Sequence, residues 1–272
     1  MEHLEFKSMT EVARYLDTTP RQDGCGDFSI REQSESECPM TWDEAIQLAR
    51  TGGYWSEGAD KMVQGVADAA ALRENHAQPM LHNDVAGFMP DVPAYLAGVP
   101  DNMVAYAQGD MTTSQTPTIT IGVGTFSWAV DSKSVMNRGI AILSLIDAIE
   151  AIGYRVQLDY VGDNKGSGGL KKIRVVLKEA SQHWNAGSVA FAIAHAGMLR
   201  RLTVGLLERD TDDITRTQAG YGTGDNGYLE EYSLAFEYMT GDYGYETLEE
   251  ALRSVESMAQ DFGMEVNLGG GA

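Results

Sequence analysis

The chain has 272 residues, of which 43% are hydrophobic, and its formal net charge is −20. This length and composition allow a substantial core and exclude a chain that is disordered throughout. The longest apolar runs, residues 139–146 and 188–199, are shorter than the roughly 20 residues of a membrane span, and the start, MEHLEFKSMTE, lacks a basic and apolar leader. Cys25 and Cys38 fit neither a CxxC pair nor a disulfide framework. We therefore expect a cytoplasmic protein with no membrane partner.

The distribution of proline predicts two regions. All seven prolines lie in the first 117 residues, and the last of them is Pro117. Because proline interrupts helices and strands, this change in composition indicates a boundary. We expect a mainly helical, proline-punctuated region over residues 1–116 and an α/β domain over residues 117–272.

Short helices are expected in the first region. Ser8 with Glu11, and Thr41 with Glu44, have capping-box spacing ahead of apolar residues at helical intervals, which predicts two helix starts. A third helix is expected over about residues 57–73. The apolar stretch 84–104 is broken repeatedly by proline and glycine, so we expect it to be pinned against another surface of the protein.

After Pro117 the pattern alternates between strands and helices. Strands are expected at residues 118–123, 154–161, 172–178 and near 232–238, with a glycine-rich turn, GDNKGSGG, after the second. Helices are expected at residues 133–152 and 184–199, and a last one starts at Thr247 with a capping box and ends at Gly263. This succession predicts a mostly parallel sheet with covering helices.

The turn after the first strand is the first place to look for a ligand, because open α/β sheets bind ligands beyond the carboxyl ends of their strands. Residues 124–134 (GTFSWAVDSKS) lack the GxGxxG spacing of a dinucleotide fold and the GxxxxGK[ST] spacing of a phosphate loop. The order of a short strand, a Ser/Thr-rich turn, a long helix ending in glycine and a second strand is similar to the von Willebrand factor A-type domain. That family binds a divalent cation through Asp-x-Ser-x-Ser directly after the first strand. Here the matching positions begin with Gly124 instead of aspartate, and Lys133 interrupts the later Asp131-Ser132-Lys133-Ser134, so we expect no metal site.

Other candidate chemistry is sparse. His183 and His195 lack an HxxxH or HxxE partner, and His195, beside Phe191 in an apolar helix, is interpreted as a core histidine. No Ser-His-Asp or Cys-His arrangement can be identified. We therefore expect no catalytic residues, no cofactor and no enzymatic activity.

Charge is strongly segregated along the chain. Residues 133–209 hold eleven Lys and Arg against six Asp and Glu, a net charge of +5, while the rest of the chain carries −25. Cations that follow phosphates, together with aromatic rings that stack on bases, are typical of single-strand binding. The predicted nucleic-acid-binding residues are Arg138, Lys165, Lys171, Lys172, Arg174, Trp184, Arg200 and Arg201. Arg200 and Arg201 could equally complement a helix C-terminus, and Trp184 could belong to the core.

Four passages together resemble a protein family encoded by tailed bacteriophages. They are TWDEAIQLARTG with SEGADKM (41–62), VAGFMPDVPAYLAGVPDNMV (85–104), NRGIAILSLIDAIEAIGYRV (137–156) and AFAIAHAGMLRR (190–201). The resemblance, which extends over about two-thirds of the chain, implies a relationship to the single-stranded-DNA-binding cofactors that bring podophage RNA polymerase to promoters. It thus implies a host-cytoplasmic transcription factor whose partners are single-stranded DNA and a phage RNA polymerase or another protein.

Two alternatives stay open. The chain could be a protein–protein adaptor with a degenerate A-type domain, which recruits a host or phage protein through its acidic surface or its proline-punctuated segment. It could also be a hydrolase or nucleotidyltransferase that uses Asp131 and a metal ion.

Overall fold

The structure is a computed structural model that describes residues 3–22, 27–34, 37–72, 81–84, 89–106, 118–127, 129–166, 169–182, 185–209, 229–261 and 268. The chain forms two compact units. One comprises Met1–Leu72 with Thr118–Ala272, and the other is Arg73–Pro117.

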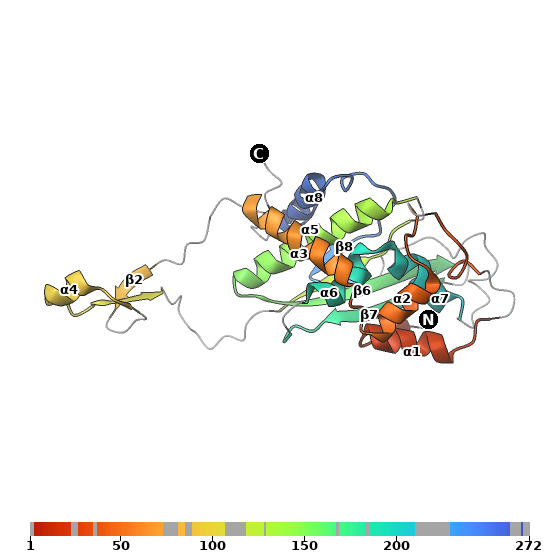
Figure 1. The fold of residues 1–272 in the computed structure, drawn as a ribbon, viewed down its shortest axis with the longest axis horizontal. Helices are drawn as coiled ribbons and strands as arrows, with labels where there is room; N and C mark the ends of the chain where they lie inside the picture. The colour runs from red at the N-terminus through yellow and green to blue at the C-terminus, as the bar shows by residue number, and fades with distance from the viewer. Residues whose placement is uncertain are drawn as a thin grey trace. The chain divides into compact units, whose positions relative to one another are not determined.

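A five-stranded sheet lies at the centre of the larger unit (Figure 1). Its strands, in spatial order, are β1 (His3–Phe6), β7 (Gly169–Lys178), β6 (Arg155–Gly166), β5 (Thr118–Gly124) and β8 (Leu234–Phe236). Neighbouring strands are parallel except β6 and β7, which are antiparallel. The predicted α/β class with a mostly parallel sheet is confirmed. The predicted glycine-rich turn was too long, because β6 continues to Gly166 and β7 begins at Gly169.

The helices of the larger unit bury one face of this sheet. They are α1 (Met9–Thr18), α2 (Trp42–Arg50), α3 (Ser56–Leu72), α5 (Ser132–Ala151), α6 (Ala186–Ala194), α7 (Val204–Leu207) and α8 (Leu248–Asp261), with a π-helical turn η1 (Met198–Thr203). A 3-10 turn, η3 (Leu229–Glu231), packs on the other face, where Leu229 lies against Val161. Val156, Leu158 and Tyr160 share a core with residues of these helices. The alternating side chains of β6, among them Asp159, lie on the other face of the sheet.

Helix α5 is the centre of the core. It contacts α3, α6, α8 and β6. Gly139 permits the close approach to α6, because a Cβ there would lie only 2.4 Å from the Cβ of Ala194. The helix stops before Gly153, whose φ of 96° is a conformation that favours glycine. The predicted helix over 133–152 with a glycine stop is thereby confirmed within one residue at each end.

Local capping signals were reliable elsewhere too. The Ser8 hydroxyl accepts a hydrogen bond from the Glu11 amide, and Thr41 and Glu44 form a complete capping box. Thr247 and Glu250 exchange the same pair of bonds at the start of α8. The predicted end of that helix at Gly263 lies outside the described residues.

The predicted domain division differs from the observed one. The boundary at Pro117 coincides with the end of the smaller unit, but the first 72 residues belong with the α/β unit. The physical reason is that β1 pairs with β7, and that α3 packs against α5 and α6. The first helices therefore complete the core of the α/β unit instead of forming a region of their own.

The predicted single helix over residues 184–199 is also wrong. Helix α6 ends at Ala194, because His195 adopts an extended backbone (φ −120°, ψ 130°), and the chain resumes in η1 and α7. Gly197 allows this break, since a Cβ there would lie 2.9 Å from Nδ1 of His195. Of the described helices, none is by itself long and apolar enough to cross a membrane; only the pair 187–194 and 198–207, bent by 71°, reaches that length and composition.

The smaller unit contains a three-stranded antiparallel sheet and one short helix. The sheet has the order β2 (Leu81–Asp84), β4 (Met103–Tyr106), β3 (Met89–Pro90), and the helix is α4 (Val92–Leu96). Asp91 caps α4 by accepting a hydrogen bond from the Ala94 amide at 3.1 Å. Within this unit Tyr95 and Leu96 are 67% and 79% exposed, so the expectation that the stretch is pinned against another surface stays a prediction.

Candidate functional site

The turn after β5, which sequence reasoning singled out, is structural. Asp131 is the N-cap of α5 and accepts a hydrogen bond from the Lys133 amide at 2.8 Å. Its own amide donates to the Asp242 carboxylate, also at 2.8 Å. Within the described part of the chain, no group of three or more His, Cys, Asp or Glu side chains is arranged to hold a metal ion.

The glycines of β5 serve packing. A Cβ on Gly122 would lie 2.6 Å from the ring of Tyr232, and one on Gly124 would lie 2.9 Å from the carbonyl oxygen of Phe236. The pattern Gly122-Val123-Gly124 thus makes room for the segment that covers this end of the sheet. No phosphate-binding role is needed to explain it.

Most of the basic residues between 133 and 209 are inside the protein. Of the nine whose side chains the structure describes, six are buried: Arg138, Lys172, Lys178, Arg200, Arg201 and Arg209. Buried cations need hydrogen-bond acceptors or counter-charges to offset their lost hydration. Each of the six therefore has to be explained by its partners in the core.

Backbone carbonyls are the main partners of the buried arginines. Arg138 donates to the carbonyl oxygens of Gly124, Phe236 and Glu237 at 2.7–2.9 Å, and so ties α5 to the ends of β5 and β8. Burial lowers the pKa of Arg138. Arg201 donates to the carbonyl oxygens of Ser29, Arg31 and Met40, and Arg200 donates to that of Val130. These side chains fix loops to the core.

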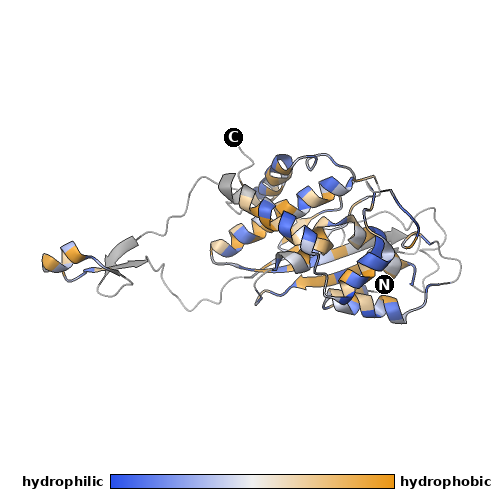
Figure 2. Ribbon diagram, in the orientation of Figure 1, coloured by the Kyte–Doolittle hydropathy of each residue, from blue (hydrophilic) through white to orange (hydrophobic). Residues whose placement is uncertain are grey.

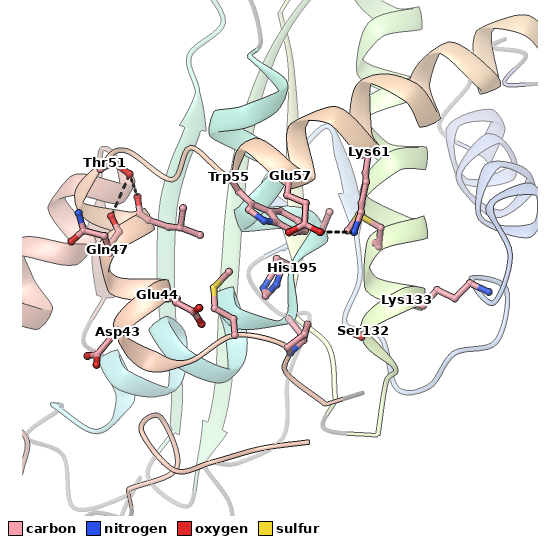
Figure 3. Close-up of a pocket in the computed structure, with 16 residues that line it drawn as sticks. Asp43, Glu44, Gln47, Thr51, Trp55, Glu57, Lys61, Ser132, Lys133 and His195 are labelled. Carbon is pink, nitrogen blue, oxygen red and sulfur yellow. Dashed lines mark hydrogen bonds and ion pairs between the residues drawn. The ribbon is translucent and has the colours of Figure 1, made fainter. Parts of the chain in front are cut away.

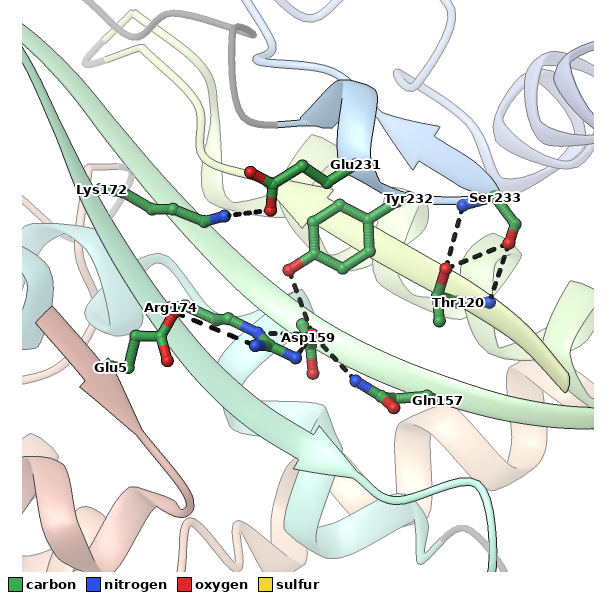
Figure 4. A network of polar contacts seen from close by, with 9 residues as sticks. All are labelled: Glu5, Thr120, Gln157, Asp159, Lys172, Arg174, Glu231, Tyr232 and Ser233. Carbon is green, nitrogen blue, oxygen red and sulfur yellow. Dashed lines mark hydrogen bonds and ion pairs between the residues drawn. The ribbon is translucent and has the colours of Figure 1, made fainter. Parts of the chain in front are cut away.

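The remaining predicted binding residues are dispersed. Lys172 is buried and pairs with Glu231 at 2.7 Å, and Arg174 pairs with Asp159 at 2.7 Å. Lys165 and Lys171 lie in β6 and β7, where Lys165 is opposite Leu170 and Lys171 is opposite Asn164. Trp184, with His183, lies outside the described residues. Four of the eight predicted residues are therefore buried: Arg138, Arg200 and Arg201 lie among the core elements, and Lys172 lies on the opposite face of the sheet, where it pairs with Glu231 (Figure 4).

A polar network occupies the sheet face opposite the core (Figure 4). The buried carboxylate of Asp159 accepts hydrogen bonds through Oδ2 from Arg174, from the Tyr232 hydroxyl at 3.0 Å and from Gln157 at 3.3 Å. Burial and the negative charge of Asp159 both raise the pKa of Tyr232. Arg174 balances the charge of Asp159, whose Oδ1 is buried and accepts no hydrogen bond from the described residues. The ion pair and the hydrogen bonds to Oδ2 link three segments of the chain, which indicates a structural role.

The larger unit carries a groove between its helices, which sequence reasoning missed (Figure 3). Its volume is about 1000 Å³. One wall comes from α2 with Asp43, Glu44 and Gln47, and another comes from the start of α3 with Glu57 and Lys61. These positions are far apart in sequence and ordinary for helix surfaces, so no local pattern could have indicated the groove.

His195 lies near the centre of the residues that line this groove (Figure 3). It is buried, as predicted, with its ring 4.6 Å from that of Trp55 in an edge-on contact and stacked 5.6 Å from Phe191. Its Nδ1 accepts a hydrogen bond from the Gly197 amide at 2.8 Å, so the proton of the neutral ring is on Nε2. Burial lowers the pKa of His195 to about 4. The imidazole is therefore neutral at physiological pH.

A second exposed feature belongs to the smaller unit. Four large apolar side chains of α4 and its following turn are exposed, namely Val92, Tyr95, Leu96 and Val99. We call them the α4 patch. Figure 2 shows the hydrophobic colouring of α4. Single exposed apolar residues are normal, but four within eight positions are typical of an interaction surface.

Comparison with known proteins places the chain in a family. A family model described as "Domain of unknown function (DUF7192)" matches residues 2–266. No curated protein and no solved structure matches the chain. Since the match extends over nearly the whole sequence, the chain belongs to the DUF7192 domain family.

Proposed function

We propose that the protein is a non-enzymatic adaptor that recruits a partner protein through the α4 patch. The observation that carries this proposal is the exposure of Val92, Tyr95, Leu96 and Val99 on α4 and its following turn in the smaller unit. Leaving such side chains in water is unfavourable by about 25 cal/mol per Å² of apolar surface. A partner that buries them gains this free energy.

Charge defines the chemistry of that partner. Residues 73–117 contain five acidic residues and one arginine, and the acids nearest the patch in sequence are Asp91 and Asp101. Aspartates beside an apolar patch favour a partner with an apolar groove bordered by Lys or Arg side chains. The strongly acidic composition of the remaining chain reinforces this preference and disfavours association with phosphate backbones.

The adaptor proposal includes a degenerate A-type domain and the relationship to the tailed-phage family. The order β5, turn, α5, β6 supports the A-type comparison. The use of Asp131 as a helix cap, and Gly124 in place of the aspartate, support the loss of its cation site. On this proposal, the larger unit is a scaffold and the host or phage partner binds to the smaller unit.

Site-specific photo-crosslinking tests the proposal. A benzoylphenylalanine introduced at Tyr95 is expected to give one discrete adduct in the cells that naturally make the protein. A second variant, which adds Leu96→Ser, should lose that adduct. The matched control places the same crosslinker at Tyr243, which is 93% exposed in the larger unit. Equal adducts at both positions, or none at Tyr95, would contradict the proposal.

Single-stranded DNA binding and polymerase recruitment stay a competing prediction. Titration of a fluorescent oligonucleotide at low and physiological salt distinguishes the two functions, because phosphate contacts weaken steeply with salt. The adaptor proposal expects no binding at either concentration. Salt-sensitive binding that is lost on changing both Lys165 and Lys171 to Glu would favour the transcription factor, since neither residue supports the α4 patch.

A further inference from the structure

We infer that the groove between α2 and α3 binds an extended segment of a partner protein that carries a lysine or arginine side chain. This inference concerns the larger unit and does not depend on the α4 patch. The adaptor proposed above needs two binding surfaces to bring two proteins together, and this groove would provide the second.

Charge on the α2 wall selects a cationic side chain. Asp43 and Glu44 both line the groove, and Glu44 already gives one carboxylate oxygen to the capping box of α2, which lowers its pKa. Asp43 is exposed, and no hydrogen bond to its carboxylate is present within the described residues. On the opposite wall, Lys61 already pairs with Glu57 at 3.2 Å. A basic side chain at the α2 wall would therefore find a free carboxylate.

The floor of the groove fits a peptide backbone with apolar side chains. His195 presents a neutral ring whose Nε2–H makes no hydrogen bond within the described part of the chain, although the side chain is 95% buried. A peptide carbonyl is a suitable acceptor for this Nε2–H, which lies at the groove. Met40, Leu48 and Met136 supply apolar contacts, and flexible methionines adapt to different side chains.

A carbonyl acceptor, apolar side chains and one cation are all present in a basic peptide segment. A free polyamine supplies the cations but has no carbonyl for His195. Lys61 and Lys133 also line the groove, but Lys61 pairs with Glu57, and the phosphates of a nucleic-acid strand would be repelled by Asp43 and Glu44 on the α2 wall. A second copy of the chain would bring another acidic protein to an acidic wall. The charge and hydrogen-bonding groups of the groove therefore favour the peptide.

The experiment uses pooled fluorescent octapeptides with blocked ends and fluorescence anisotropy at physiological salt. One pool has a central Lys or Arg flanked by mixed apolar residues, and the other has Glu at the centre. The full-length protein should bind the basic pool at least tenfold more tightly than the acidic pool. Free arginine amide should compete weakly. If arginine amide competes as well as the peptides, the site holds a small cation and the inference is wrong.

Two charge-reversal variants separate the groove from general electrostatics. Asp43→Lys should weaken binding of the basic pool at least tenfold. Asp60→Lys makes the same charge change at an exposed position of α3 that does not line the groove, and should leave binding within twofold. Equal losses in both variants, or no preference for the basic pool, would overturn the inference. The double variant Tyr95→Ser/Leu96→Ser should bind peptides normally, so failure of the α4 proposal and failure of this one are distinguishable.

Discussion

The two units of the protein treat charge and apolar surface in opposite ways. In the α/β unit, six basic side chains are buried together with the apolar core, and they bind carbonyl groups and carboxylates there. In the smaller unit, large apolar side chains are exposed on α4. The difference teaches that a cation in the sequence does not imply a charged surface, and that an apolar residue does not imply a core position.

The strongest test of this contrast is the removal of a buried cation. Arg138→Ala should lower the free energy of unfolding by about 3–5 kcal/mol, because three carbonyl oxygens would lose their donor in a buried site. Arg138→Lys should recover only part of this, since an ammonium cannot reproduce the planar fork of the guanidinium. Urea unfolding monitored by circular dichroism measures the change.

The control for that test is Arg155→Ala. Arg155 is exposed, so its removal should change stability by less than about 0.5 kcal/mol. Equal changes in the free energy of unfolding for Arg138→Ala and Arg155→Ala would show that the buried Arg138 contributes no more to stability than an exposed arginine.

Acid should destabilise the α/β unit through His195. The pKa of His195 is about 4 in the folded protein and near the usual 6.5 in the unfolded chain. Between these pH values the imidazole is protonated in the unfolded chain and neutral in the folded protein, so protonation favours unfolding. The stabilisation is complete above pH 6.5 and is lost as pH falls toward 4. Between pH 7 and pH 5 this group alone should cost about 2 kcal/mol.

His195→Gln isolates the histidine from other titrations. Glu44, Glu57 and Lys61 face the ring in both proteins, so their contribution cancels in the difference between variant and wild type. The wild type should lose about 2 kcal/mol more than the variant from pH 7 to pH 5, measured by urea unfolding at each pH. Parallel pH profiles would contradict the assignment of a neutral buried imidazole.

A smaller effect is expected from the polar network on the other sheet face. Asp159→Asn keeps the shape of the side chain but removes the counter-charge of Arg174, and should cost about 1–2 kcal/mol. Glu5→Gln is the control, because Glu5 is exposed and lies 4.0 Å from Arg174. Thermal unfolding measures the loss of stability in the two variants. A larger loss for Glu5→Gln would show that Glu5, and not Asp159, is the main counter-charge of Arg174.

The smallest effect is expected in the α4 patch. Tyr95→Ser with Leu96→Ser should change stability by less than about 0.5 kcal/mol, because neither side chain is buried by folding. The contrasting change is Ile142→Ala in α5, which removes a fully buried side chain and should cost about 2–5 kcal/mol. If the α4 double variant unfolds as readily as Ile142→Ala, the patch is part of a core and the adaptor proposal fails.

Local signals predicted much of this fold. Ser8, Thr41 and Thr247 indicated helix starts correctly because a cap involves residues only three positions apart. The stop of α5 at Gly153 was equally local. The break at His195 was not predictable from periodicity, since the apolar pattern continues through it and its cause is a contact between the His195 ring and Gly197.

The candidate sites were much less predictable. Arg200 and Arg201 were interpreted as surface cations, although the apolar residues on both sides of them, as in AGMLRRLTVGLL, were a signal of burial that charge counting ignores. The groove combines α2, α3, α5 and the end of α6, so it exists only after long-range packing. The α4 patch was visible in the sequence as an apolar segment. Its exposure depends on tertiary packing, which a local pattern does not contain.

The unequal lengths of the strands have a consequence for self-association. Among the described residues, β6 pairs with β5 as far as Val161 and β7 pairs with β1 from Lys172 onward, so the end of the hairpin extends beyond both described neighbours as a two-stranded ribbon. Unpaired strand edges are templates for aggregation, and lysines on such edges discourage it. Lys165 and Lys171 lie in this part of the ribbon. Lysines at these strand positions are expected to oppose strand addition, so neutralising both should promote dimer or fibril formation.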